Sequence, residues 1–330
     1  MDSLNVPGAH RVRARWSAAL IAIAVLGVCP AAVLARAPVP VVFNAERAPF
    51  SVQVDDTIVE YRVFGAFVTA GDIVSIRAVD AGARAPFSVR TAGPMFRKRG
   101  RGAWEGRAPM APGAYPVTVA EDGTGETLTI NLFVMIPADS TAGGRLEGFR
   151  IDAYPPPLRG LATYRAPRGY VKFTQALERA LVSPHFTLAQ FLCKQESGPV
   201  KFLALRPALL VKLERLLERV NAAGIRAQTL SVMSGYRTPF YNRGLGNTPN
   251  SRHIFGDAAD VFVDADGDGV MDDLDGNGSS DFRDAAFLLR LADQVDRSAA
   301  VTKGGAGAYR ATSAHGPFVH VDARGTVARW

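Results

Sequence analysis

The chain has 330 residues, of which 48% are hydrophobic and 21% are charged, and its formal net charge is +7. This composition excludes disordered and collagen-like chains, and the length allows about two domains with cores of their own. A charge of this size does not indicate a nucleic-acid partner, and none is expected.

The N-terminal segment has the pattern of a secretory signal. Three arginines, at positions 11, 13 and 15, precede an apolar run over residues 17–28, and small alanines follow. We therefore expect a signal peptide over residues 1–37, export to the periplasm or cell envelope, and no transmembrane domain after cleavage. An uncleaved N-terminal anchor is the alternative. Removing this segment, with its four arginines and one aspartate, lowers the net charge from +7 to +4.

Residues 38–140 predict an all-β, sandwich-like domain. Five stretches alternate apolar and polar residues with a period of two, and turn signals separate them. They are Ser51–Val54, Thr57–Val63, Asp72–Ala78, Pro112–Val119 and Thr127–Val134. Several such strands without an intervening helical period favour a small β-sandwich. The basic segment Phe96–Arg101 suits an anionic polymer or, more simply, a solvated turn.

Residues 141–182 contain a proline run and predict an extended connector that packs on one neighbour. From residue 183 the pattern changes to α+β. Helices are predicted over Pro207–Val220 and Asp284–Ala299, strands over Gln228–Met233 and Phe318–Asp322, and a glycine-rich turn at Gly304–Gly307. Helices packed on a small sheet are therefore expected in residues 183–330.

A candidate zinc site rests on His253, Asp260 and His320. The chain has only five histidines, so few other ligand sets exist. Two neutral imidazoles and one carboxylate with an open fourth position suit catalytic zinc. By spacing alone, a helix cap or a buried polar pair explains His253 and Asp260 equally well. Asp322 shares a strand face with His320, which makes it a candidate to orient that imidazole.

Four motifs give the chain a family resemblance. Ser234–Pro239 (SGYRTP), Ser251–Asp260 (SRHIFGDAAD), Gly305–Tyr309 (GAGAY) and Phe318–Asp322 (FVHVD) resemble, in this order, the D-alanyl-D-alanine carboxypeptidase and murein endopeptidase superfamily. These are zinc peptidases that share a fold with the hedgehog signalling domain. The resemblance covers about residues 183–330.

The resemblance implies zinc ligation by His253, Asp260 and His320, and a peptide of bacterial peptidoglycan as substrate. It also implies that Arg237 binds a substrate carboxylate or a polarised carbonyl, for which a guanidinium is well suited.

One position departs from the family pattern. Many relatives carry Glu or Asp three residues before the last metal histidine, where this chain has Pro317. His315 is the nearest titratable alternative as catalytic base or transition-state stabiliser. Asp322 is the other candidate base, although its position on the strand of His320 favours a role in orienting that ring.

The insertion at residues 264–284 predicts calcium binding. Asp264, Asp266, Asp268, Asp272 and Asp275 stand at positions 1, 3, 5, 9 and 12 of an EF-hand-type loop, with an Asp at position 12 as in dockerin modules. A second, overlapping copy uses Asp273, Asp275, Asn277, Asp281 and Asp284. The alternative is a solvated acidic loop.

The sequence therefore predicts an exported zinc metallopeptidase that hydrolyses peptidoglycan peptide bonds, with endopeptidase slightly favoured over carboxypeptidase. The alternative is a calcium-stabilised, catalytically degenerate wall-binding or adhesion protein. The absence of an acidic residue at Pro317 favours this alternative, whereas the complete ligand set and Arg237 favour the enzyme.

Overall fold

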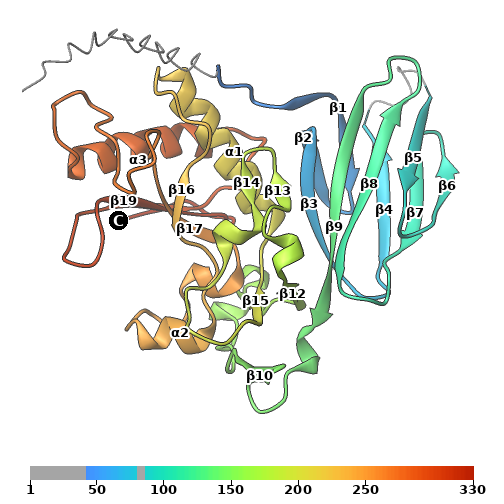
Figure 1. Cartoon of the computed structure of the whole chain (residues 1–330), viewed down its shortest axis with the longest axis horizontal. Helices are drawn as coiled ribbons and strands as arrows, with labels where there is room; N and C mark the ends of the chain where they lie inside the picture. Colours follow the sequence, from blue (N-terminus) through green and yellow to red (C-terminus); the bar gives the residue numbers. More distant parts are fainter. Residues whose placement is uncertain (1–41, 80–85) are drawn as a thin grey trace, which may run out of the picture. The chain divides into compact units, whose positions relative to one another are not determined.

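The computed structural model describes residues 42–79 and 86–330. The predicted signal peptide lies outside these residues. The described residues are mostly β-sheet with few helices, and the helices follow the first β-rich region in the chain (Figure 1). The predicted fold class, an all-β region followed by an α+β region, is thus confirmed in part. Among the described residues, no helix is long and apolar enough to cross a membrane.

Two sheets form the β-rich region. The first has the strand order β2 (Thr57–Tyr61), β1 (Arg47–Val54), β4 (Ile73–Ala78), β7 (Ala103–Arg107) and β6 (Phe96–Gly100). The second contains β5 (Phe87–Thr91), β8 (Gly113–Glu121), β9 (Thr127–Pro137) and β3 (Val63–Thr69), and β3 pairs with β9 in parallel. Buried residues alternate along β4, as the period-two pattern predicts. Phe50 and Phe87, from different sheets, meet edge to face at 5.1 Å in the core.

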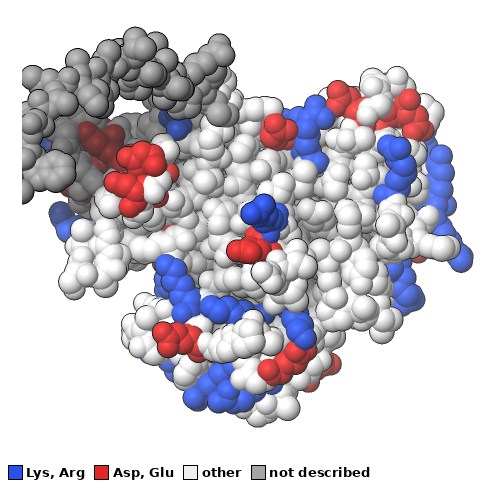
Figure 2. Space-filling model, viewed as in Figure 1, with Lys and Arg blue, Asp and Glu red and all other residues white. Residues whose placement is uncertain are grey.

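The basic segment forms the edge strand β6 and not a turn. Arg97, Lys98 and Arg99 are exposed on it, and basic side chains gather over the β5–β7 side of the sandwich in Figure 2. Charged residues on an edge strand discourage pairing with other chains.

The segment predicted as an extended connector pairs on both of its sides. Strand β12 (Gly169–Phe173) joins the end of β9 on one side and β15 (Lys201–Leu203) on the other. The same part of the chain contains the short strands β10 (Arg145–Leu146), β11 (Phe149–Arg150), β13 (Leu181–Ser183) and β14 (Phe186–Thr187). Short 3-10 turns lie at Ala138–Ser140, Leu158–Gly160, Ala162–Tyr164, Gln175–Leu177 and Leu188–Phe191. The second sheet of the sandwich therefore continues into the following region.

The third large sheet carries the candidate site. Its order is β16 (Ser231–Ser234), β17 (Ala258–Phe262), β19 (Phe318–Asp322), β18 (Gly305–Tyr309) and β20 (Ala328–Arg329). Three helices accompany it: α1 (Pro207–Ala222), α2 (Pro239–Gly244) and α3 (Phe282–Asp296). Helix α3 packs on β18, β19 and α1. The predicted apolar face of α1 is fully buried at Leu209, Leu213, Leu216, Leu217 and Val220.

The prediction of a glycine-rich turn at Gly304–Gly307 is wrong, because Gly305–Tyr309 is strand β18. The glycines serve close packing there. A Cβ atom on Gly307 would lie 2.6 Å from Nε1 of Trp330, and one on Gly305 would collide with the carboxylate of Asp322. Missing side chains here make room for neighbours and do not mark a reversal of the chain.

Candidate metal centre

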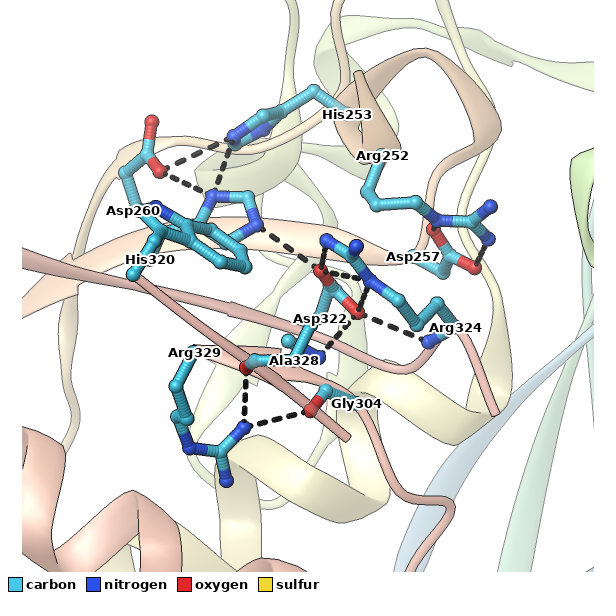
Figure 3. Close-up of polar contacts among 12 residues, drawn as sticks. Arg252, His253, Asp257, Asp260, Gly304, His320, Asp322, Arg324, Ala328 and Arg329 are labelled. Atoms are coloured by element: carbon cyan, nitrogen blue, oxygen red, sulfur yellow. Dashed lines mark hydrogen bonds and ion pairs between the residues drawn. The ribbon is translucent and has the colours of Figure 1, made fainter. Parts of the chain in front are cut away.

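Three elements bring His253, Asp260 and His320 together (Figure 3). Asp260 and His320 are direct partners in the antiparallel pair β17–β19, so their side chains stand side by side on one face of the sheet. His253 comes from the 3-10 turn Arg252–Phe255. Gly256 ends this turn with a φ of 74°, and a Cβ atom there would lie 2.5 Å from the carbonyl oxygen of Ala204. The left-handed conformation and the close approach explain why glycine stands at this position.

The three inward atoms form a nearly regular triangle. Nε2 of His253 lies 3.2 Å from Oδ1 of Asp260 and 3.2 Å from Nδ1 of His320. The third edge, from Nδ1 of His320 to Oδ1 of Asp260, measures 2.9 Å. Ligand atoms of a tetrahedral zinc ion, with bonds of about 2.0–2.2 Å, lie roughly 3.3–3.5 Å apart. The triangle thus has nearly the size that zinc requires.

The ring nitrogens of His253 and His320 that point away from the triangle determine which tautomer each imidazole adopts. Nδ1 of His253 donates to the carbonyl oxygen of Gly235 at 2.7 Å, which leaves the lone pair of Nε2 inside the triangle. Nε2 of His320 donates to Oδ2 of Asp322 at 3.3 Å, so Nδ1 faces inward. A carboxylate oxygen and two imidazole nitrogens therefore converge on one point, and this donor set fits zinc.

The electrostatics also suit a cation. Burial lowers the pKa of His253, which favours the neutral ring. Burial opposes ionisation of Asp260, but the two imidazoles hold its pKa well below the usual range. Burial likewise opposes charging of His320, yet its hydrogen bonds to Asp260 and Asp322 raise its pKa. The two carboxylates thus favour positive charge at this point, which a metal ion supplies when it replaces the Nδ1 proton.

Asp322 is held from several directions. Its carboxylate accepts hydrogen bonds from Nε of Arg324 at 2.9 Å and from the backbone N–H of Gly305 at 2.8 Å. Lys212, which is 2% exposed, donates to the backbone carbonyl of Asp322 at 2.6 Å and to Asp296 at 2.5 Å. Asp322 is fully buried, so these contacts fix the acceptor that orients His320.

Arg237 contacts the site through Asp260. Its Nη2 pairs with Oδ2 of Asp260, the oxygen outside the triangle, and its Nε donates to Oγ of Ser234 at 2.8 Å. In the described residues, Nη1 of Arg237 makes no hydrogen bond. The guanidinium therefore has one nitrogen left for a substrate, while Nη2 holds the carboxylate of Asp260 and Nε is engaged by Ser234.

In the part of the chain that the structure describes, His315 makes no hydrogen bond with His253, Asp260 or His320. Its Nδ1 lies 2.8 Å from the carbonyl oxygen of Gly316, and its ring packs edge to face on Phe318 at 5.0 Å. His315 lines a pocket of about 500 Å³ together with Phe262 and Pro317. Phe262 follows Asp260 by two residues on β17, so this pocket borders the face that carries the triangle.

The aspartate-rich loops contain two groups of converging carboxylates. One consists of Asp264, Asp266 and Asp268, and the other of Asp273, Asp275 and Asp284. The remaining predicted ligands have other contacts: Asp272 accepts from the N–H of Ala265, Asn277 donates its N–H to Asp273, and Asp281 caps helix α3. Asp284 is fully buried and accepts from the N–H of Leu274 at 2.7 Å.

Two features near the triangle escaped the sequence prediction. Arg252 and Asp257 form a buried ion pair that fixes the turn carrying His253. Their separation of five residues is no recognisable signal. The ring of Trp330 lies 5.3 Å from that of His320, and the sequence contains no signal for this contact either.

Residues 184–272, about a quarter of the chain, match the family described as Peptidase M15. The matched segment contains Arg237, His253 and Asp260, and ends before His320. No curated protein matches the chain. Among solved structures, a nucleoside hydrolase-related hypothetical protein from Saccharophagus degradans shows 14% identity over 26% of each chain, with a TM-score of 0.18. The chain thus spans about a quarter of that structure, a likeness too small to bear on fold or function.

Proposed function

We propose that the protein is a zinc metallopeptidase that hydrolyses peptide bonds of bacterial peptidoglycan. The observation that carries this proposal is the triangle of inward-facing atoms from His253, Asp260 and His320. The match of residues 184–272 to Peptidase M15 supports the same reaction class. The polar triangle alone would equally suit a structural metal, so the family match adds the catalytic part of the proposal.

Bound zinc supplies a Lewis acid for a peptide carbonyl and for water. The protein supplies the geometry. His253, Asp260 and His320 hold the ion, Asp322 orients the ring of His320, and Arg237 binds the second oxygen of Asp260. This last contact leaves Asp260 one oxygen for the metal.

Proton transfer is the second task of such a site. We assign it to His315, which lines the pocket beside the triangle. Because its Nδ1 donates to the carbonyl oxygen of Gly316, the lone pair of its Nε2 is available as a base. Replacement of His315 by Gln removes the base and keeps the size of the side chain, so turnover should fall while zinc remains bound.

Cross-link cleavage is favoured over removal of a terminal residue. A carboxypeptidase needs a cation that binds the free carboxylate of its substrate. Arg237 was the sequence-based candidate, but its Nε and Nη2 are engaged by Ser234 and Asp260. One free nitrogen suits a peptide carbonyl better than a carboxylate, which prefers two parallel donors.

Export to the periplasm or cell envelope belongs to the same proposal, because peptidoglycan lies there. Its support is the arginine-rich, apolar and alanine-rich order of residues 1–37. A structural role for Ca²⁺ is also part of the proposal. Its support is the two carboxylate groups of the 264–284 insertion, at the spacing of calcium loops.

The test combines metal analysis with digestion of purified peptidoglycan. We expect about one zinc per chain and released peptides, both lost in His253→Ala. His185→Gln is the matched control, because His185 pairs with Glu214 outside the site. Zinc in the protein without any released peptide would favour the alternative, a wall-binding or adhesion protein with a degenerate peptidase domain.

A further inference from the structure

The positive charge of the chain is concentrated in one stretch of the β-rich region. Residues 87–107 contain five arginines and one lysine against a single glutamate, a net charge of +5. Residues 1–37 contribute +3 to the total of +7, so the remaining residues together carry −1. A charge of one sign that is confined to a short stretch creates a strong local potential, although the net charge of the whole protein is modest.

The fold spreads several of these cations over the outer face of the first sheet (Figure 2). Arg97 on β6 is the register partner of Glu105 on β7, and Arg107 follows Glu105 by two residues, so these side chains stand on the same face. Arg99 is also exposed on β6 and binds Glu105, the single carboxylate of the stretch. Among the described residues, Arg97 makes no ion pair. The face therefore keeps an unbalanced positive charge.

Three exposed apolar side chains border Arg107. Ile73 on β4 is its register partner and is 52% exposed. Met95, 78% exposed, directly precedes β6 and continues the antiparallel register to Arg107 from the other side. Met110 is 74% exposed. Its Sδ lies 3.3 Å from the position that a Cβ atom of Gly71 would take, and Nη1 of Arg107 lies 3.9 Å from the same position. We call this surface the basic apolar face and define it as Ile73, Met95, Arg97, Arg99, Arg107 and Met110.

Protection of the sheet edge explains only part of this face. Charged side chains on β6 discourage pairing with other chains, but charge of either sign does so, and no apolar side chain is needed. Single exposed apolar residues are common on proteins, whereas a group of three beside unbalanced arginines marks an interaction surface. The combination indicates a partner that is negatively charged at its surface and apolar beneath it.

We propose that the basic apolar face binds the surface of an anionic lipid bilayer. Its arginines pair with lipid phosphates, and its methionines and isoleucine enter the boundary between headgroups and acyl chains. The geometry suits a planar partner. Neighbouring strands lie about 4.8 Å apart, so the row from Ile73 through Arg107 to Met95 spans about 10 Å of one sheet face. A soluble polyanion would use the arginines and leave the exposed methionines unexplained.

This inference goes beyond the proposed peptidase and does not rest on it. The basic apolar face lies on the first sheet, whereas the metal triangle lies on the third. Variants of the face should therefore leave zinc content and the hydrolysis of soluble peptides unchanged. Attachment through the β-rich region would keep the candidate metal centre at a membrane and limit which part of the peptidoglycan it reaches.

The first test measures binding to lipid vesicles by sedimentation. A chain that begins at Pro38 is used, because residues 42–330 form one compact unit and the apolar run of the predicted signal peptide would bind lipid by itself. We expect binding to phosphatidylcholine vesicles that contain phosphatidylglycerol, and at least about tenfold weaker binding to phosphatidylcholine alone.

Two pairs of substitutions test the role of charge. Arg97→Gln with Arg107→Gln should weaken binding to the anionic vesicles about 30-fold, roughly fivefold for each cation at an anionic surface. The matched control is Arg226→Gln with Arg297→Gln, which removes the same charge from exposed positions outside the β-rich region. This control should keep the affinity within about twofold. Equal vesicle binding by wild type and the Arg97/Arg107 variant overturns the proposal.

A further variant tests the apolar part of the face. Met95→Ser with Met110→Ser keeps the charge and should weaken binding to the anionic vesicles about tenfold. Binding of soluble polyphosphate, measured in parallel, distinguishes the alternative partner. If polyphosphate binds as tightly as the vesicles and the methionine variant binds vesicles like wild type, the ligand is a soluble polyanion and the proposal is overturned. Failure to hydrolyse peptidoglycan would remove the peptidase proposal and leave the vesicle result unaffected.

Discussion

The protein contains two kinds of candidate metal site, and they are built in opposite ways. In the metal triangle, three nearly buried side chains are held by the register of two strands and by a glycine-terminated turn. In the 264–284 insertion, eight aspartates stand against one arginine, four of them are exposed, and carboxylates of the cluster accept hydrogen bonds from the N–H groups of their own loops. The geometry of the first site is formed by the fold, whereas in the proposed calcium loops a bound cation would offset the repulsion between the carboxylates.

The largest expected effect is a loss of activity on mutation of the triangle, compared with little loss on mutation of the acidic insertion. His253→Ala removes one ligand from the triangle, and we expect kcat to fall about a thousandfold or more with loss of zinc. Asp268→Asn, in the exposed loop, should keep zinc and most of the activity. Peptide release from purified peptidoglycan and metal content measure both. Similar losses in the two variants would contradict the separation.

The second effect concerns how the triangle is supported. Arg252→Leu leaves the carboxylate of Asp257 buried, with the more distant Arg206, at 3.8 Å, as its remaining ion-pair partner among the described residues. Even with Arg252 present, burial raises the pKa of Asp257. We expect a loss of about 3–5 kcal/mol in the free energy of unfolding, measured with urea in zinc-free protein. A loss below about 1 kcal/mol would show that the turn does not depend on this pair.

Calcium should stabilise the insertion and leave the triangle unchanged. Calcium at about 100 times its dissociation constant adds about 2.7 kcal/mol to the free energy of unfolding if it binds only the folded chain. A calcium-selective chelator should therefore lower the melting temperature while zinc stays bound. Melting curves with and without the chelator, each followed by zinc analysis, measure this. Identical curves would favour a solvated acidic loop.

A smaller change should weaken the triangle without removing a ligand. Asp322→Asn keeps the shape of the side chain but offers His320 a weaker acceptor. We expect zinc affinity to fall about 10 to 100-fold, measured by competition with a chromogenic chelator. Retention of wild-type affinity would mean that Asp322 stabilises the strand through its contacts with Arg324 and Gly305 and does not contribute to zinc binding.

The smallest effect uses a histidine outside both sites. Burial opposes charging of His185, but its contact with Glu214, at 2.7 Å, raises its pKa. Because the pKa of His185 is higher in the folded state, protonation of this residue stabilises the fold. The stabilisation is complete at pH values below the unfolded-state pKa of about 6.5, and it is lost as the pH rises through the folded-state pKa. Wild type should exceed His185→Gln by about 1 kcal/mol at pH 6, and by less at pH 9. A difference independent of pH would contradict this.

The elements predicted well are those with a clear local period. Helix α1 begins at Pro207 as predicted, because its apolar residues recur with the helical period and proline suits the first turn. Strand β19 has the predicted bounds. Strand β18 was missed because its two glycines, Gly305 and Gly307, interrupt any apolar pattern. The reason for these glycines lies in Asp322 and Trp330, which are distant from them in the sequence.

The candidate site shows the same division. The motif around His253 and Asp260 selected both as candidate ligands from local sequence, and the fold brings them together with His320. The partner of Arg237 could not be predicted, because it depends on the register that sets Ser234 opposite Asp260. The ring contact of the proposed base could not be predicted either, since His315 meets Phe318 only through the fold of the segment between β18 and β19.

The strand β12 has a practical consequence for protein engineering. It hydrogen-bonds to β9 of the sandwich and to β15, which leads into helix α1. A fragment that begins at Leu181 would keep β15 and lose its partner β12. The backbone N–H and C=O groups of β15 would then be unpaired and free to pair with another chain. Excision of residues 181–330 alone should thus yield an aggregating product, and an exchange of the N-terminal region between homologues should include β12.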